Sequence, residues 1–137
     1  MIVHQATGVA FGEHGLLIEG PPGCGKSSLA LALIDRGGTL IGDDAVALEV
    51  REARLWALPP PNVAELLEVR NVGLVRFPAA PAAVALVVQL DPEAPRHIEQ
   101  PETVARAGIA LPLVRLWPGS PILALRAEMA LSLHGLA

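Results

Sequence analysis

The chain has 137 residues, of which 52% are hydrophobic, and this is enough apolar material for one core, so we expect one domain over residues 1–137. Its formal net charge of -4 disfavours a surface built to neutralise nucleic-acid phosphates. Proline, glycine or charged residues interrupt each apolar stretch before it reaches membrane-spanning length, which disfavours a membrane span.

The first third of the chain predicts a strand hairpin followed by a helix. Residues 2–10 mix β-branched and small residues and predict a strand, and residues 16–19 resume this character after the turn residues 12–15. Apolar residues share one helical face within residues 27–36, and Gly37 is placed to end that helix as a left-handed C-terminal cap.

The middle of the chain predicts short strands around an acidic pair. Residues 39–41 form a short apolar run that ends at Asp43-Asp44. Residues 45–50 and 54–58 predict a second hairpin, and residues 63–69 are expected to form one or two helical turns.

The last part predicts further strands and a closing helix. The expected strands are residues 72–77, 84–90, 103–106 and 113–116. The third of these lies in a polar, proline-punctuated region, 91–107, that is otherwise expected to be a loop. Ser120 and Pro121 fit an N-cap and a first helical position, predicting a helix to about His134. The alternation of strand and helix predicts an α/β fold.

The strongest motif follows the pattern G-x-x-x-x-G-K-[ST]. It consists of Gly20, Pro21, Pro22, Gly23, Cys24, Gly25, Lys26 and Ser27, with Ser28 next. Because it lies between a predicted strand and a predicted helix, it has the context of a phosphate-binding loop. Backbone N–H groups and the helix N-terminus would face the phosphates, Lys26 would reach the outer ones and Ser27 would ligate Mg²⁺. The alternative is an ordinary glycine-rich turn, which the position of the chain's single lysine disfavours.

Other candidate residues carry weaker signals. Asp43 and Asp44 would lie beside the loop in a parallel sheet and could serve a metal ion and a proton transfer, or simply face water. His4 could be functional or structural. Cys24 is the single cysteine, which excludes an internal disulfide, and the N-terminus lacks the pattern of a secretory signal, so we expect a cytoplasmic protein. The histidines lack the spacing of zinc ligands.

Four motifs in a fixed order give the chain a family resemblance. They are H-x-A-T from His4, G-P-x-G-x-G-K-S from Gly20, R-G-x-x-L-x-x-D-D from Arg36 and L-L-E-V-R-x-V-G-L from Leu66. In this order the chain resembles the HPr kinase/phosphorylase family, and in particular its short alphaproteobacterial form, which has the C-terminal catalytic domain only. The likeness runs from His4 to the C-terminal helix.

The resemblance implies a mixed sheet related to phosphoenolpyruvate carboxykinase and a defined reaction. Family enzymes transfer the γ-phosphoryl group of ATP to a serine of the phosphocarrier HPr, and many reverse this with inorganic phosphate. By this likeness Asp43 would be the acid/base near the transferred phosphoryl group, and His4 would tune it. Ser27, Asp44 and Glu68 would serve Mg²⁺, although Glu68 alone would be taken for an exposed carboxylate.

The chain departs from the family pattern in ways that leave alternatives open. Ser28 and Asn71 replace the family's usual residues, and Ser120 stands where the family carries an arginine used for dephosphorylation. Arg115 could substitute for it, or dephosphorylation could be weak or absent. A non-catalytic nucleotide-binding sensor is the main alternative, and a small-metabolite kinase is a weaker one. An HPr-like carrier is the expected partner, and the arginines in the second half of this chain would provide the positive charges on which the carrier docks. Homo-oligomer formation is left open.

Overall fold

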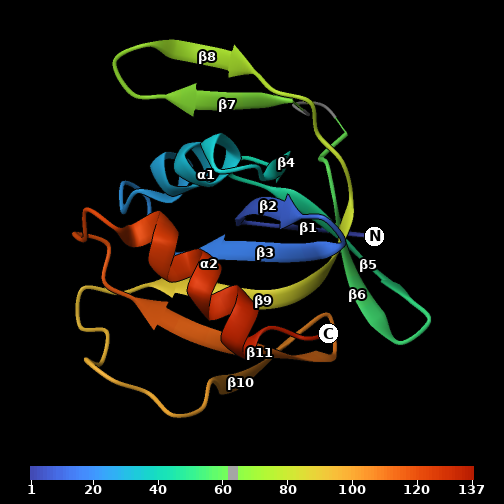
Figure 1. Ribbon diagram of the computed structural model, residues 1–137. Coiled ribbons are helices and arrows are strands. Elements are labelled where there is room, and N and C mark those ends of the chain that lie inside the picture. Colours follow the sequence, from blue (N-terminus) through green and yellow to red (C-terminus); the bar gives the residue numbers. More distant parts are fainter. Residues whose placement is uncertain (62–64) are drawn as a thin grey trace.

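The computed structural model describes residues 1–61 and 65–137 and shows an α/β fold with a mixed sheet (Figure 1). The strands are β1 (Ile2–His4), β2 (Thr7–Phe11), β3 (His14–Glu19), β4 (Thr39–Gly42), β5 (Val46–Arg51), β6 (Arg54–Leu58), β7 (Leu66–Val69), β8 (Gly73–Arg76), β9 (Ala82–Leu90), β10 (Glu102–Arg106) and β11 (Ile109–Leu116). The helices are α1 (Lys26–Asp35) and α2 (Leu123–His134). Within the described ranges, neither helix is long and apolar enough to cross a membrane.

The main sheet has the order β1-β5-β6-β9-β3-β2-β4, and β11, carrying β10, pairs with β9 as well. Strand β9 runs parallel to β3 and to β11, whereas β2 is antiparallel to both β3 and β4. Strands β3 and β4 therefore point the same way, with β2 between them. As a result, their carboxyl ends lie at one edge of the sheet, where the chain enters the glycine-rich loop and where Asp43-Asp44 follows β4.

Two apolar clusters form on opposite faces of the central strands because residues alternate between the faces of a strand. Leu16 and Ile18 of β3 belong to the cluster that also holds Leu33 of α1 and Ala127 of α2. The intervening Leu17 belongs to the second cluster, with apolar residues of β5, β6 and β11. Both helices therefore cover one face (Figure 1), and apolar residues of β5, β6, β10 and β11 pack together on the other.

The end of α1 confirms the predicted glycine cap. Gly37 has φ 106°, in the left-handed region, and its N–H bonds to the carbonyl of Ile34 at 3.0 Å. The Gly38 N–H bonds to the carbonyl of Leu33 at 2.9 Å, which completes a Schellman motif. This sharp stop turns the chain directly into β4, so the glycine-rich loop and the acidic pair are linked by one helix and one strand.

Three predicted elements differ from the structure. The strand expected over 2–10 is two strands, because the chain leaves its pairing with β5 at His4 and begins pairing with β3 at Thr7. The helical turns expected over 63–69 are wrong where the structure describes them, since Leu66–Val69 is β7, paired with β8; residues 63 and 64 lie outside the described residues. Helix α2 begins at Leu123 rather than at Pro121, and the Ser120 hydroxyl instead accepts the N–H of Ile122 at 3.1 Å.

Candidate functional site

The glycine-rich loop, residues 20–27, joins the end of β3 to the start of α1. Gly23 and Gly25 have φ of 78° and 102°, conformations that residues with a Cβ rarely adopt, so the motif's glycines are required by the backbone path. Gly25 is the N-cap of α1 and provides no side-chain cap, and the first turn of this helix contains no acidic residue. The helix N-terminus therefore retains its positive end for an anion.

Lys26 folds back over the loop that precedes it. Its ammonium donates hydrogen bonds to the carbonyl of Gly20 at 2.8 Å and to that of Pro21 at 3.1 Å. An ammonium has three N–H donors, so these two bonds hold it in place and leave a third for a ligand.

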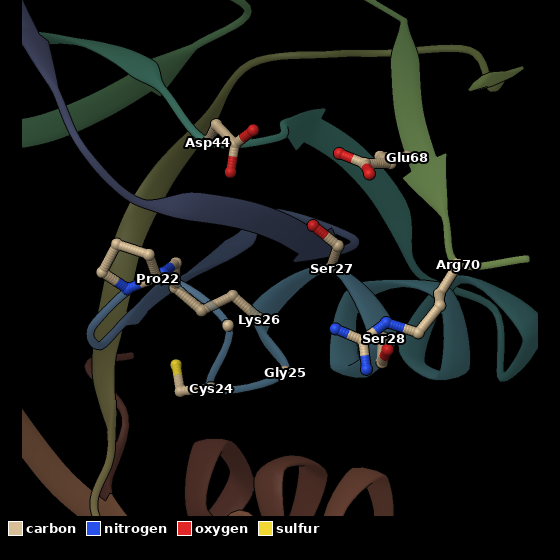
Figure 2. A pocket seen from close by; sticks show the side chains of 10 residues that line it. Pro22, Cys24, Gly25, Lys26, Ser27, Ser28, Asp44, Glu68 and Arg70 are labelled. Atoms are coloured by element: carbon tan, nitrogen blue, oxygen red, sulfur yellow. The ribbon is translucent and has the colours of Figure 1, made fainter. Parts of the chain in front are cut away.

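A cavity of about 360 Å³ opens above this loop. It is lined by Pro22, Gly23, Cys24, Gly25, Lys26, Ser27, Ser28, Asp44, Glu68 and Arg70. Figure 2 shows the Ser27 hydroxyl pointing toward the space between the carboxylates of Asp44 and Glu68, and Arg70 and Ser28 line the same cavity. One side of the cavity thus carries oxygen ligands and the other carries cations and helix N–H groups.

Asp43 does not line the cavity as described but is joined to it by a hydrogen bond from Ser27. The Ser27 hydroxyl donates to Asp43 Oδ1 at 2.6 Å, and the Thr7 hydroxyl donates to the same oxygen at 3.2 Å. The backbone N–H of Glu68 donates to Asp43 Oδ2 at 3.2 Å. Asp43 is only 9% exposed, and residues of the loop, of β2 and of β7 bond its carboxylate, so the orientation of the carboxylate is set from three directions.

The β7–β8 hairpin brings Glu68 and Arg70 to the cavity. Leu67 is fully buried in the same cluster as Leu29 and Leu33 of α1, and this fixes the hairpin on the helix. Since side chains alternate along a strand, burial of Leu67 turns the neighbouring Glu68 outward. Asp44, on the opposite side, has φ 63°, and its N–H bonds to the Thr7 hydroxyl at 3.5 Å.

His4 lies in a second charged cluster rather than on Asp43. Its Nε2 is 2.7 Å from Glu19 Oε2, and Arg106 donates to both Glu19 oxygens, at 2.6 and 3.0 Å. Burial alone would raise the pKa of Glu19, but the hydrogen bonds and charges of Arg106 and His4 outweigh it and lower that pKa below its ordinary value. Glu19 is the last residue of β3, directly before the loop.

The predicted site residues therefore divide into three groups. Lys26, Ser27, Ser28, Asp44 and Glu68 meet at one cavity, Asp43 joins it through Ser27, and His4 pairs with Glu19.

The sequence pattern did not single out several contributors to these groups. Thr7 belongs to the H-x-A-T motif, but the motif alone assigned it no role in the site. Glu19 could have been noticed as a charged residue ending an apolar strand, whereas Arg106, 87 positions further on, has no local signal.

The cavity offers oxygen ligands for a metal ion, but too few to fill its coordination shell. Among residues 1–61 and 65–137, no group of three or more His, Cys, Asp or Glu side chains is arranged to hold a metal by itself. Ser27, Asp44 and Glu68 present hard oxygen ligands. Magnesium commonly takes one or two carboxylates and completes its shell with water and substrate phosphates, so this set fits Mg²⁺ that arrives with a nucleotide.

These features define an α/β protein in which a glycine-rich loop, a buried aspartate and a carboxylate-lined cavity lie at one edge of a mixed sheet. Residues 2–86 match the family model of the HPr Serine kinase C-terminal domain. The chain belongs to this family.

Similar proteins agree with that assignment. The chain is 43% identical over 65 residues to an HPr kinase/phosphorylase of Clostridium tetani, covering 47% of this chain and 21% of the relative. It is 44% identical over 62 residues to one of Streptococcus thermophilus, covering 44% of this chain and 20% of the relative. The chain thus spans about a fifth of the length of these curated relatives.

The fold extends the likeness beyond those segments. The structure of the Hpr(Ser) kinase/phosphatase from Coxiella burnetii superposes with a TM-score of 0.83 at 26% identity, covering 96% of this chain and 95% of that one. The fold is therefore shared from end to end.

Proposed function

We propose that this protein is an ATP-dependent protein-serine kinase that phosphorylates an HPr-like phosphocarrier, on a fold related to phosphoenolpyruvate carboxykinase. The observation that carries the proposal is the ammonium of Lys26, which two loop carbonyls hold at the N-terminus of α1, while the next residue, Ser27, bonds the buried Asp43. The family and the names of the similar proteins supply the substrate class.

The nucleotide phosphates would lie over the glycine-rich loop, with Lys26 and Arg70 as their cationic contacts. Ser27, Asp44 and Glu68 would hold Mg²⁺, which neutralises charge on the phosphates when bound. The chain's own contribution is to orient the phosphoryl group against the acceptor hydroxyl, since phosphoryl transfer depends mainly on positioning and charge.

Asp43 would take the proton from the acceptor serine. Each carboxylate oxygen has two lone pairs. The hydroxyls of Ser27 and Thr7 occupy both lone pairs of Oδ1, whereas Oδ2 accepts only the Glu68 N–H among the bonds of the described chain. The remaining lone pair of Oδ2 is therefore the site that we assign to proton acceptance.

The residues of this chain favour phosphorylation of the carrier over its phosphorolytic dephosphorylation. Arg115, the candidate to replace the arginine missing at Ser120, donates instead to Glu102 at 2.7 Å and to Asp91 at 3.2 Å. Ser120 is only 9% exposed, and its hydroxyl accepts the N–H of Ile122 in the turn before α2. We therefore expect phosphorolytic dephosphorylation to be weak relative to phosphorylation.

Mass spectrometry of HPr-like carriers, incubated with the protein, Mg²⁺ and ATP, tests the proposal. The expected result is one added phosphoryl group on a serine, lost with a Lys26→Ala variant that remains folded. Nucleotide binding without transfer to any carrier would overturn the kinase proposal and favour a sensor that binds nucleotide without turnover.

A further inference from the structure

The cluster of Glu19, His4 and Arg106 lies outside the cavity, yet it adjoins the first residue of the glycine-rich loop. The Glu19 side chain is 11% exposed, and that of Arg106 is 23% exposed. A buried carboxylate and a mostly buried guanidinium cost solvation free energy, which is offset here by a bidentate pair. Such a pair has a demanding geometry and therefore holds its backbone attachments in fixed positions.

The backbone attached to Glu19 carries the groups that hold Lys26. The carbonyls of Gly20 and Pro21, the next two residues, accept both hydrogen bonds of the Lys26 ammonium. Space at this point is tight as well, since a Cβ on Gly20 would lie 2.6 Å from the sulfur of Cys24. A shift of the end of β3 would therefore move both carbonyls and displace the ammonium.

The cluster also joins segments that are distant in sequence. His4 ends β1, Glu19 ends β3 and Arg106 ends β10, so one carboxylate connects three strand ends. The second apolar cluster contains Leu17 of β3, two residues before Glu19 on the same face, and Val104 of β10 packs against it.

We propose that Glu19 is a positioning residue of the nucleotide site: clamped by Arg106 and His4, it fixes the start of the glycine-rich loop so that Lys26 is placed for the phosphates. This inference rests on the proposed nucleotide binding and names a residue outside the cavity on which that binding depends. It makes a prediction that runs against simple electrostatics. Removing a negative charge near a phosphate site should strengthen binding of a polyanion if charge alone mattered, whereas loss of the clamp should weaken it.

The test is calorimetric titration of the full chain with Mg²⁺ and AMP-PNP, well below each variant's unfolding temperature. Glu19→Gln is expected to raise the dissociation constant about tenfold, because the neutral amide leaves the Arg106 guanidinium without its carboxylate. Glu128→Gln is the matched control, since it breaks the pair of Glu128 with Arg36, between α2 and α1, and should leave the dissociation constant unchanged. Unchanged or tighter binding by folded Glu19→Gln would overturn the proposal.

A double variant keeps the proposal falsifiable if Glu19→Gln folds poorly. Glu19→Gln with Arg106→Gln leaves no unpaired buried charge, and should bind about as weakly as the single variant, since residues acting as a unit are not additive. Binding restored to the wild-type value would show that the pair contributes only to folding. Lys26→Ala separates the two proposals. If this variant still binds AMP-PNP, the proposed nucleotide site is wrong. If Lys26→Ala loses binding but Glu19→Gln binds normally, only the positioning role of Glu19 is refuted.

Discussion

The hydroxyl of Ser27 donates a 2.6 Å hydrogen bond to Oδ1 of Asp43, and this bond joins the first turn of α1 to the residue that follows β4. The contact arises because β3 and β4 run in the same direction on either side of β2. A loop that leaves β3 and an acidic pair that leaves β4 must then meet at one edge. Asp43 is thereby set beside the place where the phosphates are proposed to bind.

Asp43→Asn is expected to abolish phosphoryl transfer while changing nucleotide affinity by no more than about threefold, because the residue lies behind Ser27 and would act on the acceptor proton. An amide nitrogen at the Oδ2 position cannot accept the Glu68 N–H or a proton. Phosphoserine formation and AMP-PNP binding should be measured on the same preparation. Transfer retained within tenfold of the wild-type rate would refute the role of proton acceptor.

Lys26→Ala is expected to weaken nucleotide binding by on the order of 100-fold, because it removes a charge-assisted hydrogen bond to the phosphates. The matched control is Arg54→Gln, which removes an exposed positive charge at the start of β6, away from the cavity. Calorimetric titration with AMP-PNP checks both variants. Equal affinity of Lys26→Ala and Arg54→Gln would exclude the loop as the phosphate site.

Local patterns allowed much of the fold to be predicted from the sequence. The helix after the loop, the cap at Gly37 and the hairpin of β5 and β6 depend on nearby residues, and all three are confirmed. The mixed sheet implied by the family resemblance is confirmed too. Residues 66–69 were misassigned because a short apolar piece has no decisive period, and its pairing partner in β8 settles it as a strand.

The connections between distant residues could not be predicted in the same way. Sequence spacing brought Asp43 near the loop only through an assumed parallel sheet, and gave no sign that Thr7 and the Glu68 N–H would hold it. The pairing of His4 with Glu19 rather than with Asp43 depends on how β1 and β10 fold toward the end of β3. Such contacts follow from tertiary packing and leave no periodic signal.

Arg70→Gln is expected to weaken AMP-PNP binding about fivefold and to reduce its dependence on salt, since a guanidinium lining the cavity would attract the phosphates. Arg76→Gln is the control on the same hairpin, because Arg76 is exposed at the far end of β8. Titrations at two ionic strengths measure both effects. The contribution of Arg70 would be disproved if the two variants had the same affinity and the same salt dependence.

The stabilising effect of Glu19 should depend on pH in a direction that its surroundings determine. Although burial opposes ionisation, Arg106 and His4 lower the pKa of Glu19 below its ordinary value of 4.5. A carboxylate with a lowered folded-state pKa stabilises the fold fully above its unfolded pKa, and loses this effect as the pH falls through the folded value. Glu19→Gln should therefore cost about 1–3 kcal/mol near pH 7, with the deficit shrinking below pH 4.5. Denaturant unfolding of the wild type and of Glu19→Gln from pH 7 to pH 3 checks this, with Glu128→Gln as control. If the difference in free energy of unfolding stayed constant with pH, the ionised carboxylate would not be the stabilising group.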